Sequence, residues 1–142
     1  MKVTLAVIAD YANVTKEGKL NILGIFDTIH ATSFPCTHPS LLLVFKLEAG
    51  MTEVGRNKKV EVQLMDEDGT KLMSIGTELV IGPVRPGELF ITGSILTFQN
   101  LVFPKPGTYQ FDIFIDNQPR EEGRVLLKVV RIPKNDEESR VS

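Results

Sequence analysis

The sequence has no tryptophan, one cysteine and two histidines among its 142 residues. A lone cysteine can form no disulfide within the chain, and it is compatible with a reducing compartment. Because there are only two tyrosines as well, the chain is short of the aromatic side chains on which sugars and unpaired bases stack. These shortages count against a disulfide-stabilised fold and against a sugar-binding surface.

The chain also lacks a strong charge of one sign and long apolar runs. Sixteen basic and eighteen acidic residues leave a net charge of −2, which counts against a protein that grips nucleic acid through positive charge. No apolar run approaches the roughly 20 residues of a membrane-spanning helix. The stretch Val3–Ala9 contains Thr4 and stops at Asp10, so it is a poor secretion signal. We therefore expect a cytoplasmic protein with no membrane span and no nucleic-acid partner.

What the sequence does contain favours strands. Val, Ile and Thr supply 36 of the 142 residues, whereas Ala supplies five. β-branched side chains suit the pleated surface of a sheet, and Ala is the best helix former. Apolar and polar residues alternate in short segments separated by turn residues. Strands are expected at Lys2–Tyr11, Leu20–Ile29, Leu41–Glu48, Lys58–Met65, Lys71–Ile81, Glu88–Gln99, Tyr109–Ile115 and Arg124–Ile132, with a proline-containing loop at Ser33–Ser40.

This spacing predicts an all-β fold, an antiparallel two-sheet β-sandwich of about eight strands. Greek-key, immunoglobulin-like and jelly-roll arrangements all fit, because strand order is not readable from one sequence. No segment repeats with a fixed period, so we expect a single domain over residues 1–132. Residues 133–142 are polar and are expected to form a frayed tail.

A proline-glycine corner precedes one alternating segment. The residues are Pro104-Lys105-Pro106-Gly107-Thr108-Tyr109, followed by a strand and an Asp116-Asn117 turn. The pattern resembles the penultimate strand of immunoglobulin-like sandwiches, in which a buried Tyr hydroxyl bonds to nearby backbone. The antibody-type signature needs a Cys–Trp–Cys set, which this chain does not have. The resemblance therefore extends to the architecture alone.

A second resemblance rests on three segments of the chain. They are MKVTLAVIADYANV at residues 1–14, KLNILGIFD at residues 19–27, and FPKPGTY at residues 103–109. With these segments the chain, from residue 1 to about 131, resembles a family of short uncharacterised bacterial proteins. The resemblance implies a bacterial or related source and a stand-alone domain. It carries over no catalytic residue, because no activity is assigned to that family.

Two groups of residues are candidates for a metal site, both weak. His30, Cys36 and His38 lie in or near the loop before the third expected strand, at the same predicted end of the sandwich as Asp66 and Asp68. A zinc site needs three or four ligands, and the usual paired Cys or His spacings are absent. The acidic turn falls short of the calcium-loop pattern. We interpret both groups as structural and expect no metal and no cofactor.

Catalytic motifs are equally sparse. Cys36 with His30 or His38 can imitate a Cys–His dyad, but Pro35 precedes the thiol and no Gly-rich oxyanion loop follows it. The nucleophile elbow, the phosphate-binding loop and the dinucleotide fingerprint are all absent. We therefore expect that the protein is not an enzyme, and a Cys/His-based enzyme is the least favoured hypothesis.

Three expected strand segments are apolar on both faces, namely Val3–Ala9, Leu20–Ile29 and Leu41–Val44. One face of an antiparallel sheet usually meets water, so a partner, another copy of the chain or a long loop should cover these outer faces. The leading hypothesis is a non-enzymatic interaction module that forms a homo-oligomer or docks on a protein partner. The alternative is a small-ligand binder, with an apolar molecule between the sheets or a divalent ion in the end loops. Replacing Ile8 or Leu42 with Lys is then expected to change oligomeric state or solubility.

Overall fold

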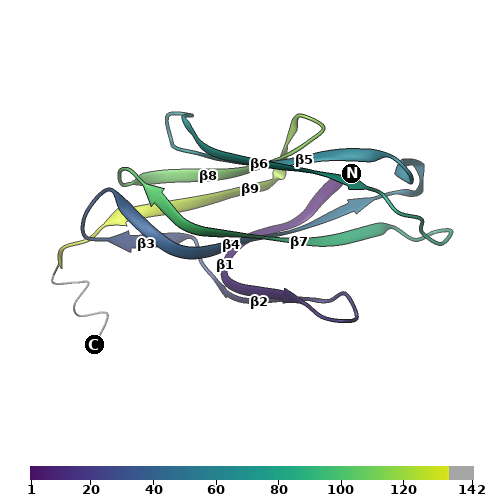
Figure 1. The fold of residues 1–142 in the computed structure, drawn as a ribbon, viewed down its shortest axis with the longest axis horizontal. Coiled ribbons are helices and arrows are strands. Elements are labelled where there is room, and N and C mark those ends of the chain that lie inside the picture. Colours follow the sequence, from purple (N-terminus) through teal and green to yellow (C-terminus); the bar gives the residue numbers. More distant parts are fainter. Residues whose placement is uncertain (135–142) are drawn as a thin grey trace.

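The computed structural model describes residues 1–134, and all of its long elements are strands (Figure 1). In chain order they are β1 (Lys2–Val14), β2 (Leu20–Ile25), β3 (Thr28–Ala31), β4 (Cys36–Ala49), β5 (Asn57–Met65), β6 (Lys71–Val80), β7 (Phe90–Phe103), β8 (Gly107–Ile115) and β9 (Gln118–Arg131), with a single 3-10 turn, η1 (Met51–Glu53). The all-β prediction is confirmed. Most of the predicted frayed tail, residues 135–142, lies outside the described residues.

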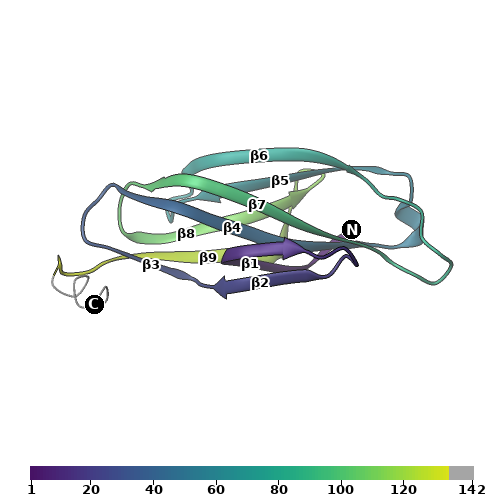
Figure 2. The same cartoon turned by 60° about the horizontal axis from the view of Figure 1, so that its bottom comes forward.

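The strands form two sheets that pack face to face (Figure 2). The four-stranded sheet has the order β2-β1-β4-β7, and the five-stranded sheet has the order β3-β9-β8-β5-β6. Every described pair of neighbouring strands is antiparallel except β3 and β9, which run parallel. The predicted sandwich is confirmed, and the expectation that all its strands are antiparallel is wrong at this one edge.

The expected strand Leu20–Ile29 is two strands that belong to different sheets. Phe26 and Asp27 lie between β2 and β3 and carry the chain across the sandwich. The Phe26 N–H donates to the Ile8 carbonyl, 3.0 Å away in the four-stranded sheet, and the Asp27 carbonyl accepts from the Lys128 N–H, 2.8 Å away in the other. The alternating apolar pattern continues through Phe26 and Asp27 because the strands before and after them each turn one face toward the rest of the protein.

The expected loop Ser33–Ser40 is also shorter than predicted, because β4 begins at Cys36. Pro39 stands in this part of the strand, and the register with β7 passes from His38 to Ser40 without pairing it. Asn100, opposite in that register, has a φ of 56°. The ladder therefore leaves out both residues, which allows a proline to stand within a strand.

The main core lies between the sheets, and its largest fully buried side chains include Phe103, Tyr109 and Phe111. The Tyr109 hydroxyl donates to the Lys105 carbonyl at 2.6 Å. Its ring meets the edge of Phe103 at a centroid distance of 4.9 Å. The predicted corner, with a buried tyrosine bonded to nearby backbone, is confirmed.

The outer face of the four-stranded sheet is apolar too, and the chain covers it with its own hairpin. β1 pairs with β4 only as far as Ala9, and beyond that point β1 and β2 bend together across this face (Figure 1). A second cluster forms beneath the hairpin, consisting of buried Ala12, Leu42 and Val44 packed against Val7, Leu20, Ile22 and Ile95. Leu20 reaches as far as β7, since a Cβ placed on Gly93 would lie 2.6 Å from its Cδ1. The apolar outer face is thus explained within one chain.

Candidate functional site

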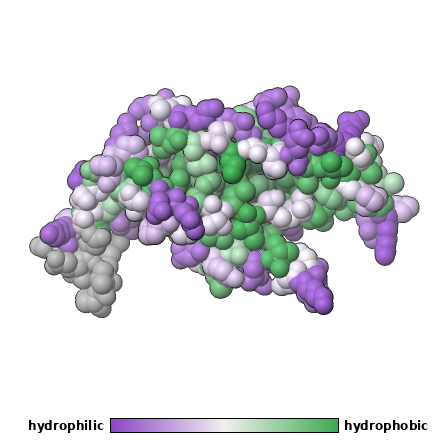
Figure 3. All heavy atoms as spheres, in the orientation of Figure 1, coloured by the Kyte–Doolittle hydropathy of each residue, from purple (hydrophilic) through white to green (hydrophobic). Residues whose placement is uncertain are grey.

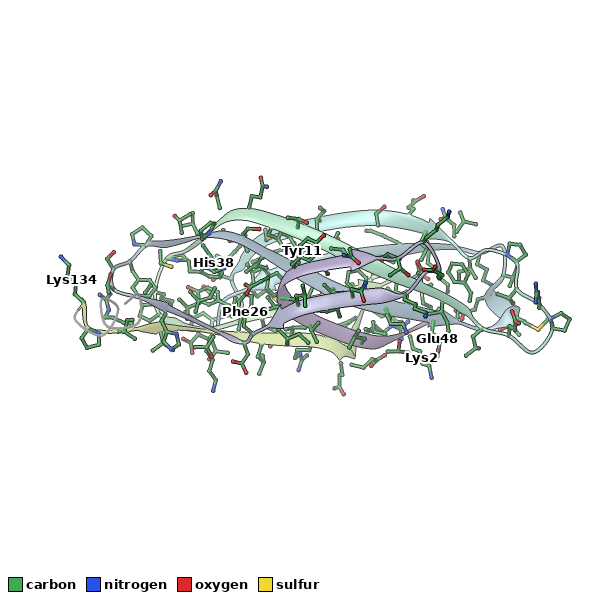
Figure 4. The ribbon with its side chains drawn as sticks, turned by 90° about the horizontal axis from the view of Figure 1, so that it is seen from below. Lys2, Tyr11, Phe26, His38, Glu48 and Lys134 are labelled. Atoms are coloured by element: carbon green, nitrogen blue, oxygen red, sulfur yellow. The ribbon has the colours of Figure 1, made fainter. Side chains whose placement is uncertain are left out.

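The three sulfur and imidazole candidates line one shallow pocket at one end of the sandwich. His30 lies in β3, whereas Cys36 and His38 lie in β4. The His38 ring packs 5.9 Å from the Phe26 ring, centroid to centroid (Figure 4). Burial raises the pKa of the Cys36 thiol, which disfavours the nucleophilic thiolate. In residues 1–134, no group of three or more His, Cys, Asp or Glu side chains is placed to share a metal ion.

The acidic candidates Asp66 and Asp68 serve the β5–β6 hairpin. The Asp66 Oδ1 accepts from the N–H groups of Asp68 and Thr70, each at 2.9 Å. The Asp68 carboxylate pairs with the Lys105 Nζ at 2.9 Å, which joins this hairpin to the β7–β8 turn. Asp66 therefore acts as the side chain of an Asx turn, in agreement with its interpretation as a turn residue.

At the opposite end of the sandwich, Asp116 connects the β8–β9 turn to β5. Its Oδ1 accepts from the Lys59 N–H at 3.0 Å, and its Oδ2 lies 3.3 Å from the Lys58 Nζ. The same Nζ lies 3.4 Å from a Glu53 carboxylate oxygen. The bond from the Lys59 N–H, aided by Lys58, lowers the pKa of Asp116. These contacts fasten the β8–β9 turn to β5, and they are structural.

A different feature has the shape of a binding site, and it is an apolar cleft between the two sheets. Its volume is about 270 Å³, and its walls come from β4, β5, β6 and β7. The main apolar side chains in these walls are Phe45, Leu47, Val62, Ile75, Leu79 and Leu96, with Thr77 and Ser94 beside them. Ile75 faces the opposite sheet and is nevertheless 45% exposed. Figure 3 shows hydrophobic residues along the middle of the face that carries this opening.

The cleft is open because the two sheets are unequal in width. Since β2 is folded onto the outer face, only β1, β4 and β7 face the five strands of the other sheet. β1 packs on β9, where a Cβ on Gly123 would lie 3.2 Å from Val3, and Phe98 of β7 packs on Phe111 of β8 with ring centroids 5.6 Å apart. Counted from that closed side, β6 is the last strand of the wider sheet, and none of its ten residues is buried.

Strands β6 and β7 are the last strands of their sheets on this side, so each has one unpaired edge. The fourteen residues of β7 include no charged residue and no proline. β6 carries charge only at Lys71 and Glu78. Sheet edges in proteins are usually protected by Lys, Pro, bulges or very short strands. The edge of β7 has little of this protection.

Sequence reasoning placed the candidate sites in the end loops and missed the cleft. Part of the signal was present, because Met73, Ile75, Thr77 and Leu79 stand at every second position of the expected strand Lys71–Ile81. The long uncharged segment that became β7 was a second signal. What neither showed was that β6 stays largely uncovered at the open side of the sandwich.

A second exposed apolar surface lies on the outside of the β1–β2 hairpin. Tyr11 and Leu23 are cross-strand partners there, and Ile25 follows on the same face. Their exposed fractions are 52%, 63% and 62%. The patch consists of three side chains on a hairpin surface, whereas the cleft is concave and runs beside an unpaired strand edge. The cleft is therefore the better candidate for a binding site.

The fold defines the class of protein, an all-β sandwich of two sheets. Within this class the chain belongs to a family of unknown function, DUF6941, whose model matches residues 4–130. The family resemblance expected from the sequence is confirmed, and the bacterial source remains a prediction. None of the curated proteins compared with the chain matches it. Among the described residues, no helix has the length and apolar character needed to cross a membrane.

Proposed function

We propose that this protein is a non-enzymatic binding module that docks on a protein partner through the open side of its sandwich. The observation that supports this is the cleft, in which core-type side chains such as Ile75 remain accessible to water. Covering apolar surface contributes about 25 cal/mol per Å². A partner that covers the cleft therefore gains affinity from residues that the chain has already ordered.

The proposal favours a partner over self-association through the outer sheet face. That form of self-association was expected because several strands are apolar on both faces. Leu42 and Val44, which supply much of that pattern in β4, are buried beneath the chain's own hairpin. The cleft is the apolar concavity that this hairpin leaves uncovered.

We propose further that the sandwich is of the immunoglobulin-like type. The order β3-β9-β8-β5-β6, with β3 parallel to β9, supports this assignment. So does the buried Tyr109 at the corner between β7 and β8. Such sandwiches commonly serve as binding scaffolds, and this is an analogy of fold alone. A cytoplasmic location is proposed with it, which the unpaired Cys36 thiol supports.

A small apolar ligand in the same cleft is the second candidate. The walls suit such a ligand, but a volume of about 270 Å³ lies below the roughly 300–1,000 Å³ of most small-molecule pockets. Native mass spectrometry of the purified chain separates the two candidates. Retained mass above 15.8 kDa would favour the ligand, whereas the bare chain is expected under partner docking.

Site-specific photo-crosslinking in the native host tests the docking proposal. A photoreactive amino acid in place of Thr77 lies in the cleft, and the matched control replaces Lys128, an exposed residue on the outer face of β9. We expect a discrete adduct with another protein from position 77 and none from position 128. Equal labelling at both positions, or an adduct of two copies of this chain, would overturn the proposal.

A further inference from the structure

We propose that the partner contributes an extended strand that pairs with the free edge of β7 and turns alternate apolar side chains into the cleft. This inference rests on the proposed function and names the chemistry of the partner. The binding segment is uncharged, and apolar and polar residues alternate along it. Backbone pairing supplies affinity in this mode of recognition, and the pockets for alternate side chains supply specificity.

The first support is the edge of β7 itself. β7 pairs with β4 from Phe90 to Phe103, except at Asn100, and has no described neighbour on its other side. In an antiparallel pair, every second residue turns its N–H and C=O away from the partner strand. β7 therefore presents a row of unpaired backbone groups. Asn100, with a φ of 56°, interrupts the regular strand, so the available stretch is Phe90–Gln99.

The second support is the vacant position beside β7. A strand added there continues the four-stranded sheet at the mouth of the cleft, one wall of which is β6, and none of the ten residues of β6 is buried. Its inward side chains reach Ile75 and Leu79, next to Ser94 and Leu96 of β7. Side chains on a strand alternate between faces, which explains the required period of two. A cleft of about 270 Å³ is on the scale of a few side chains.

The other free edges are less suitable. β6 carries Lys71 and Glu78, and charged side chains discourage a new strand. β3 spans only Thr28–Ala31. β2 contains Gly24, whose φ is 71°, and it is folded across the outer face of its own sheet. β7 is thus the edge that combines length, lack of charge and an adjoining apolar cleft.

A second copy of the chain suits this position less well. If its β7 paired with this β7 about a two-fold axis normal to the sheet, the same face of the copy's β7 would turn inward, and this face carries Thr92 and Ser94. The walls of the cleft are mainly apolar, so they favour a strand with apolar side chains at these positions, from a different protein.

Hydrogen exchange measured for each backbone amide by NMR tests the inference with the full chain and synthetic peptides. The probe is acetyl-Lys-Thr-Val-Thr-Ile-Thr-Val-Thr-Lys-amide. The matched control has the same composition with its apolar residues grouped, acetyl-Lys-Thr-Thr-Val-Ile-Val-Thr-Thr-Lys-amide. We expect the probe to slow exchange at every second amide of Phe90–Gln99 by at least about tenfold, and the control to leave these amides unchanged.

Two variants in the cleft and one control variant keep the test independent of folding effects. Ile75→Lys places a charge in the cleft and is expected to weaken probe binding at least about tenfold, since a mispaired charge in an apolar contact costs more than 1.4 kcal/mol. Thr77→Lys provides the same test if the first variant is unstable, and Val130→Lys on the outer face of β9 should leave binding unchanged. Equal binding of both peptides, or protection of β6 instead of β7, would overturn strand addition. If an adduct still forms from position 77 in cells, docking through the cleft survives without strand addition.

Discussion

The outer face of the four-stranded sheet and the inner face of β6 are built from similar apolar residues, but they differ in their exposure to water. Leu42, on the outer face, is 7% exposed because the β1–β2 hairpin lies over it. Ile75, on an inner face, is 45% exposed because β6 is the last strand of its sheet and borders the open cleft. An outward-facing residue is thus buried and an inward-facing residue is open to water. The apolar pattern indicates which faces gain stability from burial. The path of the chain decides which of these faces are buried.

The largest expected effect comes from placing the same charge on each side of this comparison. Leu42→Lys buries an ammonium group under the hairpin without a partner and is expected to lower the free energy of unfolding by roughly 3–5 kcal/mol. Ile75→Lys keeps its charge in water at the mouth of the cleft and should cost less than about 1 kcal/mol. Urea denaturation of both variants measures the difference. Losses of equal size would contradict the contrast between the two faces.

The second prediction tests whether the hairpin is seated on β7. Gly93→Val would place a side chain where the Leu20 methyl groups lie, with Cβ only 2.6 Å from Cδ1. We expect a loss of about 1–3 kcal/mol in unfolding free energy, which is usual for overpacking. Gly76→Val is the control, because the nearest atom to its Cβ is the Val60 carbonyl oxygen at 3.7 Å. If the two valines have the same effect on urea denaturation, the hairpin does not press on Gly93.

The third prediction concerns the corner that the sequence revealed. Tyr109→Phe removes the hydroxyl that donates to the Lys105 carbonyl and should cost about 1 kcal/mol. The matched control is Tyr11→Phe, since Tyr11 is 52% exposed on the hairpin. We expect its unfolding midpoint in urea to match that of the unmodified chain. A stable Tyr109→Phe variant would show that the ring alone holds the corner.

The smallest effect is expected at Asp116, and it depends on pH. Its pKa is lowered below the ordinary 3.8 by the Lys59 N–H, so the folded state favours the carboxylate. The resulting stability is fully present above pH 3.8 and is lost as the pH falls through the lower folded value. Asp116→Asn keeps an acceptor oxygen for the N–H but removes the charge near Lys58. The gap in urea midpoint between the two proteins should therefore be present at pH 7 and close in strong acid. If the difference in urea midpoint were the same in strong acid as at pH 7, the stabilisation would come from the geometry of the turn and not from the charge of Asp116.

How well each feature could be predicted depends on how far apart in the sequence the residues that form it lie. The alternation in Lys58–Met65 and the corner before Tyr109 are local, and both were read correctly from neighbouring residues. The switch between sheets at Phe26 and Asp27 was missed, because apolar residues continue on either side of it. The true start of β4 at Cys36 was missed because Pro39 suggests a loop, and only the register with β7 shows where that proline is tolerated.

The candidate site was the least predictable feature, for the same physical reason. Metal and thiol chemistry can be sought by spacing, so His30, Cys36, His38 and the acidic turn were found by sequence, and the structure gives Asp66 and Asp68 contacts within and beside their hairpin. A cleft between sheets has no such spacing. It depends on which strands are neighbours and on the width of each sheet, and segments far apart in the chain set both.

The sequence by itself determined that this chain is built of strands, where most of them lie, and that Tyr109 closes a corner. These properties follow from the preferences of single residues and from a side-chain period of two, which neighbouring residues decide together. The tertiary structure alone decided that the hairpin covers one apolar face and that the cleft beside β7 stays open. Those outcomes depend on strand order and on the bend after Ala9, where contacts between distant segments outweigh local preference.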